Sequence, residues 1–293
     1  MIRKLLMKKI NTVIDAYTSR EEASHENKKV TRKLESCRQR KAEILKVEAE
    51  GKIQFITPQN RDTRNVAYDV HYKYFIKQGN HFYLEEEVEN RKCIYFNEAI
   101  YEDEEVLPII PEEPEVKTDF IESQAIQDRG IYQYDRLKAI QYAEKWWNSY
   151  NPAYKKFEND CTNYISQCLH AGDAPMRGYP SQGKGWWMRN NSWSYSWTVA
   201  NSLRWYIPSS SIGLRGKVVE YPEQLKLGDV ICYDFQGDGR FDHTTIVTGK
   251  DGLGMPLVNA HTFNSRMRYW NYEDSTAYTP NIKYKFFTII DDS

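Results

Sequence analysis

A short stretch from Asn159 to Leu169 constrains the fold of this chain more than any other. After Cys161, apolar side chains recur at the three- and four-residue spacing of a helix with one face in a core: Tyr164, Ile165, Cys168 and Leu169. Asn159 and Asp160 are favourable residues at a helix start, and Gly172 is favourable just beyond a helix end. The sequence therefore predicts a core helix with Cys161 in its first turn.

A cysteine in this position has the chemistry of a nucleophile, although a lone cysteine is more often a small buried hydrophobe. The partial positive charge at a helix N-terminus lowers the pKa of a thiol. A thiolate also needs a general base and a group that orients the base. His243 starts one predicted strand, and Asn259 and His261 lie two residues apart on one face of another. The Cys161 N–H, which has no helical acceptor, could contribute to an oxyanion hole together with a neighbouring polar side chain.

The first hundred residues predict a small domain of their own. Apolar spacing indicates a helix from Ile2 to Tyr17, and the charged segment 19–46 continues as helix. From Gly51 the period changes to the alternation of strands, and we expect a meander of about four strands, of which the last two cover 81–88 and 92–101. Helices followed by a meander predict an α+β domain over residues 1–106.

A Pro-rich acidic stretch separates this domain from the rest of the chain. Residues 107–127 are predicted to form a semi-rigid linker, so a fragment that starts after it should fold alone. Residues 128–293 begin with helices and end in a run of strands, which again predicts an α+β domain. The intervening segment 173–215, rich in Gly, Ser, Asn and Trp, is expected to be mostly loop.

Composition excludes several classes of protein. The net charge is −1, so nothing in the composition argues for wholesale binding of nucleic acid. The five cysteines are scattered and form no CxxC pair, so neither a zinc ribbon nor a disulfide framework is indicated. The N-terminal apolar run is too short for a signal peptide, and no stretch approaches the roughly 18 apolar residues of a membrane span. We expect a protein without a transmembrane segment, in the cytoplasm or, after release, at the spore or cell wall.

Four motifs resemble one family in the same order. The run Asp160-Cys161-Thr162-Asn163-Tyr164-Ile165-Ser166-Gln167 is similar to the nucleophile motif of the putative amidase domain found in spore-forming bacteria. The strand motifs of that domain are similar to 227–231, to 242–249 around His243, and to Asn259-Ala260-His261-Thr262. The resemblance covers roughly residues 130–290 and extends remotely to NlpC-type and CHAP-type cell-wall peptidases.

This resemblance implies a papain-like fold that hydrolyses amide bonds, with peptidoglycan or a peptide as substrate and no cofactor or metal. It implies Cys161 as nucleophile and His243 as base. NlpC-type enzymes commonly place a His one strand later, which favours His261 as the orienting residue, whereas an alignment shifted by two residues would give Asn259. Asp160 and Asn163, the polar neighbours of Cys161, are candidates to contact the substrate.

Other readings of the same residues stay open. The loop 234–239 partly resembles a calcium loop, but a Gly-rich hairpin is favoured because the twelfth position is Thr245 rather than Glu. Asp242, His243 and His261 could hold zinc in a zinc-dependent hydrolase. The chain could also be a catalytically silent cell-wall or carbohydrate-binding module. Four tryptophans could line a substrate groove or belong to the core: Trp186, Trp187, Trp193 and Trp197.

Overall fold

The computed structural model describes residues 1–18, 27–60, 62–107 and 132–292. The chain divides into two compact units. The first consists of Met1–Leu107, Asp251–Leu253 and Phe263–Tyr278. The second consists of Pro108–Lys250, Gly254–Thr262 and Thr279–Ser293. The predicted linker lies, apart from Leu107, outside the described residues. The sequence assigned all of 128–293 to one domain, whereas residues 263–278 are built into the first unit.

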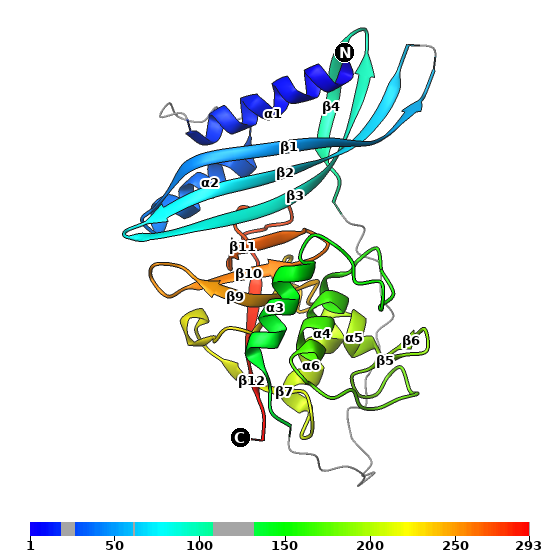
Figure 1. Cartoon of the computed structure of the whole chain (residues 1–293), viewed down its shortest axis with the longest axis vertical. Helices are drawn as coiled ribbons and strands as arrows, with labels where there is room; N and C mark the ends of the chain where they lie inside the picture. The colour runs from blue at the N-terminus through cyan, green and yellow to red at the C-terminus, as the bar shows by residue number, and fades with distance from the viewer. Residues whose placement is uncertain (19–26, 61, 108–131, 293) are drawn as a thin grey trace. The chain divides into compact units, whose positions relative to one another are not determined.

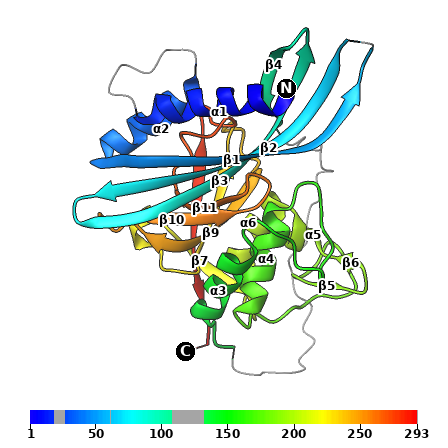
Figure 2. The same ribbon diagram turned by 45° about the horizontal axis from the view of Figure 1, so that its top comes forward.

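The first unit is a long antiparallel meander covered by two helices. Its successive strands are β1 (Ala42–Pro58), β2 (Arg64–Gln78) and β3 (His81–Phe96). The helices α1 (Ile2–Thr18) and α2 (Lys28–Gln39) lie along the same face of these strands (Figures 1 and 2). Gly51 on β1 permits close packing, because a Cβ there would lie 2.7 Å from Ile10 Cδ1 of α1. Two further strands pair with β3: β4 (Ala99–Glu105) and β11 (Ser265–Tyr269).

Two predictions for this unit were wrong. The charged segment does not stay helical to residue 46, since α2 ends at Gln39 and β1 begins at Ala42. The two strands expected at 81–88 and 92–101 are instead the single strand β3 and the shorter β4. The charged residues in the middle of β3 resembled a break in the strand, but several of them are buried and paired.

A buried ion cluster joins β3 to the segment 263–278. Lys33 of α2, 2% exposed, lies 2.5 Å from Glu85 of β3 and 2.8 Å from Asp274. Asp274 in turn accepts a hydrogen bond of 2.8 Å from Arg268. Because each of these charges is buried, removing one partner would leave the others uncompensated. The cluster therefore fixes the segment 263–278 within the first unit.

The second unit packs helices on an antiparallel sheet. The strand order is β10-β9-β8-β12-β7, and a separate two-stranded pair is formed by β5 and β6. The strands are β5 (Met188–Arg189), β6 (Ser192–Trp193), β7 (Arg215–Val219), β8 (Val230–Asp234), β9 (His243–Lys250), β10 (Pro256–Ala260) and β12 (Lys283–Ile290). The helices are α3 (Arg136–Trp146), α4 (Cys161–Ala171), α5 (Tyr195–Thr198) and α6 (Ala200–Ser209), with a 3-10 turn at Pro222–Gln224. Both units are thus of the expected α+β class.

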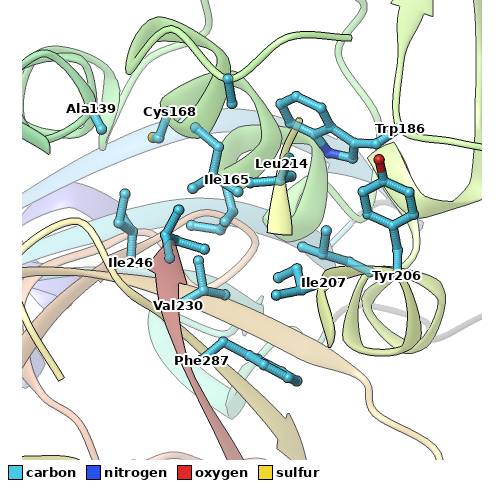
Figure 3. Packing of buried hydrophobic residues seen from close by; sticks show 14 of the residues in the cluster. Ala139, Ile165, Cys168, Trp186, Tyr206, Ile207, Leu214, Val230, Ile246 and Phe287 are labelled. Carbon is cyan, nitrogen blue, oxygen red and sulfur yellow. The ribbon is translucent and has the colours of Figure 1, made fainter. Parts of the chain in front are cut away.

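The core of the second unit lies between α4 and the sheet. Figure 3 shows Ile165 of α4 beside Ile246 of β9 and Val230 of β8, and all three side chains are fully buried. The same core includes Leu203 and Ile207 of α6, in the segment that the sequence predicted to be mostly loop. Most of that segment lies outside helices and strands, as expected, but α5 and α6 fall within it, and the apolar spacing of Leu203 and Ile207 in α6 is helical. No helix in the described part of the chain is long and apolar enough to cross a membrane.

Candidate active site

Cys161 occupies the first turn of α4, as the sequence predicts. The helix is inserted deeply, and Tyr164, Ile165, Cys168 and Leu169 are all 0% exposed. The Tyr164 hydroxyl donates to the Ala143 carbonyl of α3 at 2.8 Å, which fixes the depth of the helix. These contacts hold the Cys161 turn at a defined position beside the sheet.

The sulfur of Cys161 lies against the start of β9. Its Sγ is 3.9 Å from the carbonyl oxygen of Asp242 and 3.7 Å from the Thr162 hydroxyl. The Thr162 hydroxyl is 3.1 Å from that of Thr244, which ties the helix turn to the strand. Cys161 thus adjoins the backbone of the residue that immediately precedes His243.

The ionisation of this thiol differs from the expectation. Burial raises the pKa of the Cys161 thiol, and hydrogen bonds from Thr162 and Thr244 offset that effect only in part. The side chain is 5% exposed, so water does little to stabilise a thiolate. Desolvation therefore disfavours the thiolate, whereas the sequence led us to expect a lowered pKa.

Thr262 was quoted within a motif but given no role by the sequence, and it caps the turn. Its hydroxyl oxygen accepts the backbone N–H of Asp160 at 2.9 Å and that of Cys161 at 3.0 Å. The Cys161 N–H was expected to serve an oxyanion hole, and in this structure its acceptor is Thr262. The only sequence signal for this role is that Thr262 follows His261 directly.

His261 links the turn to α3. Its Nδ1 lies 2.8 Å from Asp160 Oδ2, and its Nε2 lies 2.7 Å from the Trp146 carbonyl oxygen. A carbonyl only accepts, so Nε2 is the donor in its contact with Trp146. The ring also stacks on Tyr164 with centroids 4.0 Å apart. The two nitrogens of His261 are therefore engaged by Asp160 and Trp146, and the ring contacts the nucleophile turn rather than orienting a base on β9.

Asn259, the other candidate for the orienting role, also reaches α3. Its Nδ2 donates to Glu144 at 2.8 Å, and its Oδ1 accepts from the Thr248 hydroxyl at 2.7 Å. Asn259 and His261 both contact α3, so their side chains point to the same face of the sheet, as their two-residue spacing predicts.

His243, the expected base, is buried at the first position of β9. It pairs across the sheet with Tyr233 of β8, and its ring centroid lies 5.7 Å from that of Tyr233 and 6.0 Å from that of Phe235. The preceding residue, Asp242, has a carboxyl whose pKa burial raises to about 6, with the charges of Asp234 and Asp238 acting in the same direction. A second titratable group therefore lies beside the expected base.

Three of the four tryptophans proposed for a groove belong to the core. Trp186, Trp187 and Trp197 are at most 1% exposed. Their indole N–H groups donate inside the unit: Trp186 to Ser166, Trp187 to the carbonyls of Ser181 and Lys184, and Trp197 to Asn163. Because they are buried, these three side chains do not contact a substrate in this conformation. Their indole N–H groups are hydrogen-bonded to polar groups of the same unit, so a segment rich in polar residues can contain buried tryptophans.

Trp193 differs from the other three because it is only partly buried. Its ring packs edge-on against Phe157 with centroids 4.8 Å apart, and Lys155 Nζ lies 4.3 Å from its centroid. Lys155 and Phe157 belong to the segment that leads directly into Cys161. Of the four tryptophans, Trp193 is the one with a side chain exposed enough for a ligand to contact.

Asp160 and Asn163, expected to contact substrate, are each 1% exposed and act within the protein. Asp160 Oδ1 accepts the Phe157 N–H at 3.0 Å and the Asn163 amide at 2.9 Å. Asn163 also donates to the Lys155 carbonyl at 3.0 Å. The two side chains thus order the loop before Cys161 instead of facing a ligand.

The alternatives based on metal ions find little support in the geometry. Asp234 accepts the N–H groups of Gly237, Asp238 and Gly239, so its carboxylate is used within the Gly-rich hairpin. Among residues 1–18, 27–60, 62–107 and 132–292, no group of three or more His, Cys, Asp or Glu side chains is arranged to hold a metal ion. The zinc set of Asp242, His243 and His261 would require His261 to give up Asp160 or Trp146.

Comparisons with known proteins agree with the motifs. The model of the family described as "Putative amidase domain" matches residues 133–287. The uncharacterized protein YhbB of Bacillus subtilis (strain 168) is 46% identical over 299 residues, which cover 100% of this chain and 96% of YhbB. The uncharacterized protein YjcM of the same strain is 34% identical over 140 residues, 45% of this chain and 31% of YjcM. No solved structure matches the chain significantly.

Proposed function

The chain belongs to the putative amidase domain family, and on this premise we propose that it is a cysteine-dependent hydrolase of amide bonds with a papain-like second unit. Cys161 is the nucleophile and His243 is the general base. The observation that carries the proposal is the place of Cys161, in the first turn of a core helix with its sulfur 3.9 Å from the backbone that leads into His243. A merely structural cysteine would need no such arrangement.

The proposed reaction has two steps. His243 takes the proton from Sγ while the sulfur attacks the amide carbonyl carbon. His243 then gives that proton to the departing amine, and the acyl group stays on Cys161 as a thioester. Water then attacks the thioester, His243 accepts its proton, and the carboxylic acid is released while the thiol is restored. Because burial raises the pKa of Cys161, proton removal accompanies attack instead of preceding it.

This step requires the His243 ring to come within hydrogen-bond reach of the sulfur. Catalytic hydrogen bonds are often long before substrate binds and tighten in the complex. His261 has a different role: its contact with Asp160 helps to hold the turn that contains Cys161.

For the substrate we propose the peptide part of peptidoglycan. The similarity of the motifs to cell-wall peptidases supports this class. Trp193, Phe157 and Lys155 offer an accessible aromatic surface beside a positive charge, which suits a peptide that carries carboxylates. Such a substrate implies that the protein acts at the cell or spore wall.

Digestion of purified muropeptides, followed by mass analysis, identifies the bond that is cleaved. We expect a gain of one water and a new free amine in the products, with Cys161→Ser producing neither. Cleavage by the wild type that is lost in EDTA and restored by zinc would replace this proposal with the zinc-dependent hydrolase. Binding to muropeptides without cleavage would support the silent module.

A further inference from the structure

We infer that Thr262 is a positioning residue whose hydroxyl fixes the turn that carries the nucleophile. The inference rests on the proposed role of Cys161 and adds to it a residue that neither the motifs nor the family assigns. It is carried by two independent observations, the hydrogen bonds of the hydroxyl and the backbone conformation of Thr262.

The Thr262 hydroxyl accepts N–H groups at the start of α4, where the N-cap residue makes no side-chain capping bond. The first N–H groups of a helix have no acceptor within the helix, and a side chain at the N-cap normally supplies one. Asp160 stands at the N-cap but makes no capping bond with its side chain. Thr262, from the end of β10, instead accepts the N–H groups of Asp160 and Cys161 at 2.9 and 3.0 Å. One oxygen therefore anchors both residues that set the direction of the sulfur.

The backbone of Thr262 is held in an unfavourable conformation. Its φ is +73°, in the left-handed region that β-branched residues rarely adopt. Such a conformation costs free energy and persists only where its surroundings enforce it. A glycine or asparagine would occupy this position without that cost, so a threonine here indicates that its hydroxyl is needed.

The neighbouring residue shows what enforces the conformation. His261 is fixed by Asp160 on one ring nitrogen and by the Trp146 carbonyl on the other. Asp160 is thus held twice, through its side chain by His261 and through its N–H by Thr262. These two consecutive residues, His261 and Thr262, hold the Cys161 turn from outside the helix.

The experiment compares Thr262→Val with Thr262→Ser in the full chain. Valine keeps the shape and the branch but removes the acceptor, whereas serine keeps the acceptor. Ser194→Ala is the matched control, because Ser194 is a buried hydroxyl in the same unit that accepts the Trp187 N–H at 3.0 Å. Two quantities are measured for each variant: the rate of Cys161 alkylation by iodoacetamide against pH, and muropeptide cleavage.

We expect Thr262→Val to lower kcat about tenfold or more with little change in KM, on the scale of lost positioning. Its alkylation midpoint should fall toward the roughly 8.5 of an ordinary thiol, because the loosened turn exposes the sulfur. Thr262→Ser and Ser194→Ala should keep the wild-type midpoint and cleave within about threefold. If Thr262→Val fails to fold, Thr262→Ala takes its place with the same expectation, since alanine reduces the steric strain.

The inference is overturned if the valine or alanine variant keeps both the wild-type midpoint and the wild-type kcat, or if serine is impaired as strongly as valine. The alkylation measurement needs no substrate. A wild type that cleaves nothing would therefore contradict the proposed function, while a shifted midpoint in Thr262→Val would still support the positioning role.

Discussion

Asp160 Oδ2 lies 2.8 Å from His261 Nδ1, and this contact joins the residue before the nucleophile to the residue that follows β10. Both side chains are at most 3% exposed. The pair connects two of the four motifs that point to the family. It explains why a His and an Asp are needed at these positions even though neither faces the expected base.

Breaking this pair should destabilise the protein strongly. We expect Asp160→Ala to lower the free energy of unfolding by about 3 kcal/mol, because it leaves His261 buried without its carboxylate. Urea denaturation measures the change. A double-mutant cycle with His261→Ala isolates the pair, and a coupling energy below about 0.5 kcal/mol would show that the two residues act independently.

The Cys161 thiol should ionise at a higher pH than the thiol of free cysteine. Because burial raises its pKa, we expect the midpoint of its alkylation rate to lie above the roughly 8.5 of free cysteine. All five cysteines are buried, so the modified residue is identified by peptide mass, with Cys161→Ser as control. A midpoint at or below that of free cysteine would mean that the helix terminus and a nearby base dominate over burial.

Asp242 should make stability depend on pH in the mildly acidic range. Burial raises the pKa of its carboxyl to about 6. A carboxyl whose pKa rises on folding favours the native state fully below its unfolded pKa of about 3.9. That contribution is lost as the pH rises through about 6. We therefore expect the wild type to lose thermal stability relative to Asp242→Asn between about pH 4 and pH 7.

The control for this measurement is Asp15→Asn, at an exposed position of α1. The control should track the wild type at every pH. If the difference between wild type and Asp242→Asn is constant across the range, the carboxyl of Asp242 is already ionised at acidic pH.

The segment 263–278 should need the first unit. In a fragment of residues 128–293, β11 lacks β3, and Asp274 lacks Lys33. We expect the β11 amides to exchange with deuterium much faster in the fragment than in the full chain, where hydrogen exchange reports local opening. Equal protection in both would show that the second unit can order this segment alone, as the sequence-based expectation of an independent fragment requires.

Much of the fold could be predicted from periodicity. The two helices and the meander of the first unit, the helix at Cys161 and the strand at 283–290 all follow regular apolar spacing. What failed were places where burial contradicts local chemistry. The gap expected at 89–91 lies inside β3, where Glu89 is buried and lies 2.6 Å from Lys29 of α2, and no local pattern shows a partner 60 residues away.

The candidate site was predictable in its residue types but less so in its contacts. The spacing placed Cys161 in a first turn and gave Asn259 and His261 one direction. It did not indicate that His261 binds Asp160, that Thr262 adopts a positive φ, or that Trp186 and its neighbours are buried. These contacts depend on how β10 ends beside α4, which is a tertiary relation between segments about a hundred residues apart.

The most direct test of the central claim is the rate of amine release from cell-wall peptides by wild type, Cys161→Ala and His243→Ala at equal concentration. Alanine at position 161 removes the nucleophile, and we expect its kcat/KM to fall about a thousandfold or more, to the background of the assay. His243→Ala should fall by about a hundredfold or more, the scale of general base catalysis. A Cys161→Ala protein that releases amine at the wild-type rate would contradict the account.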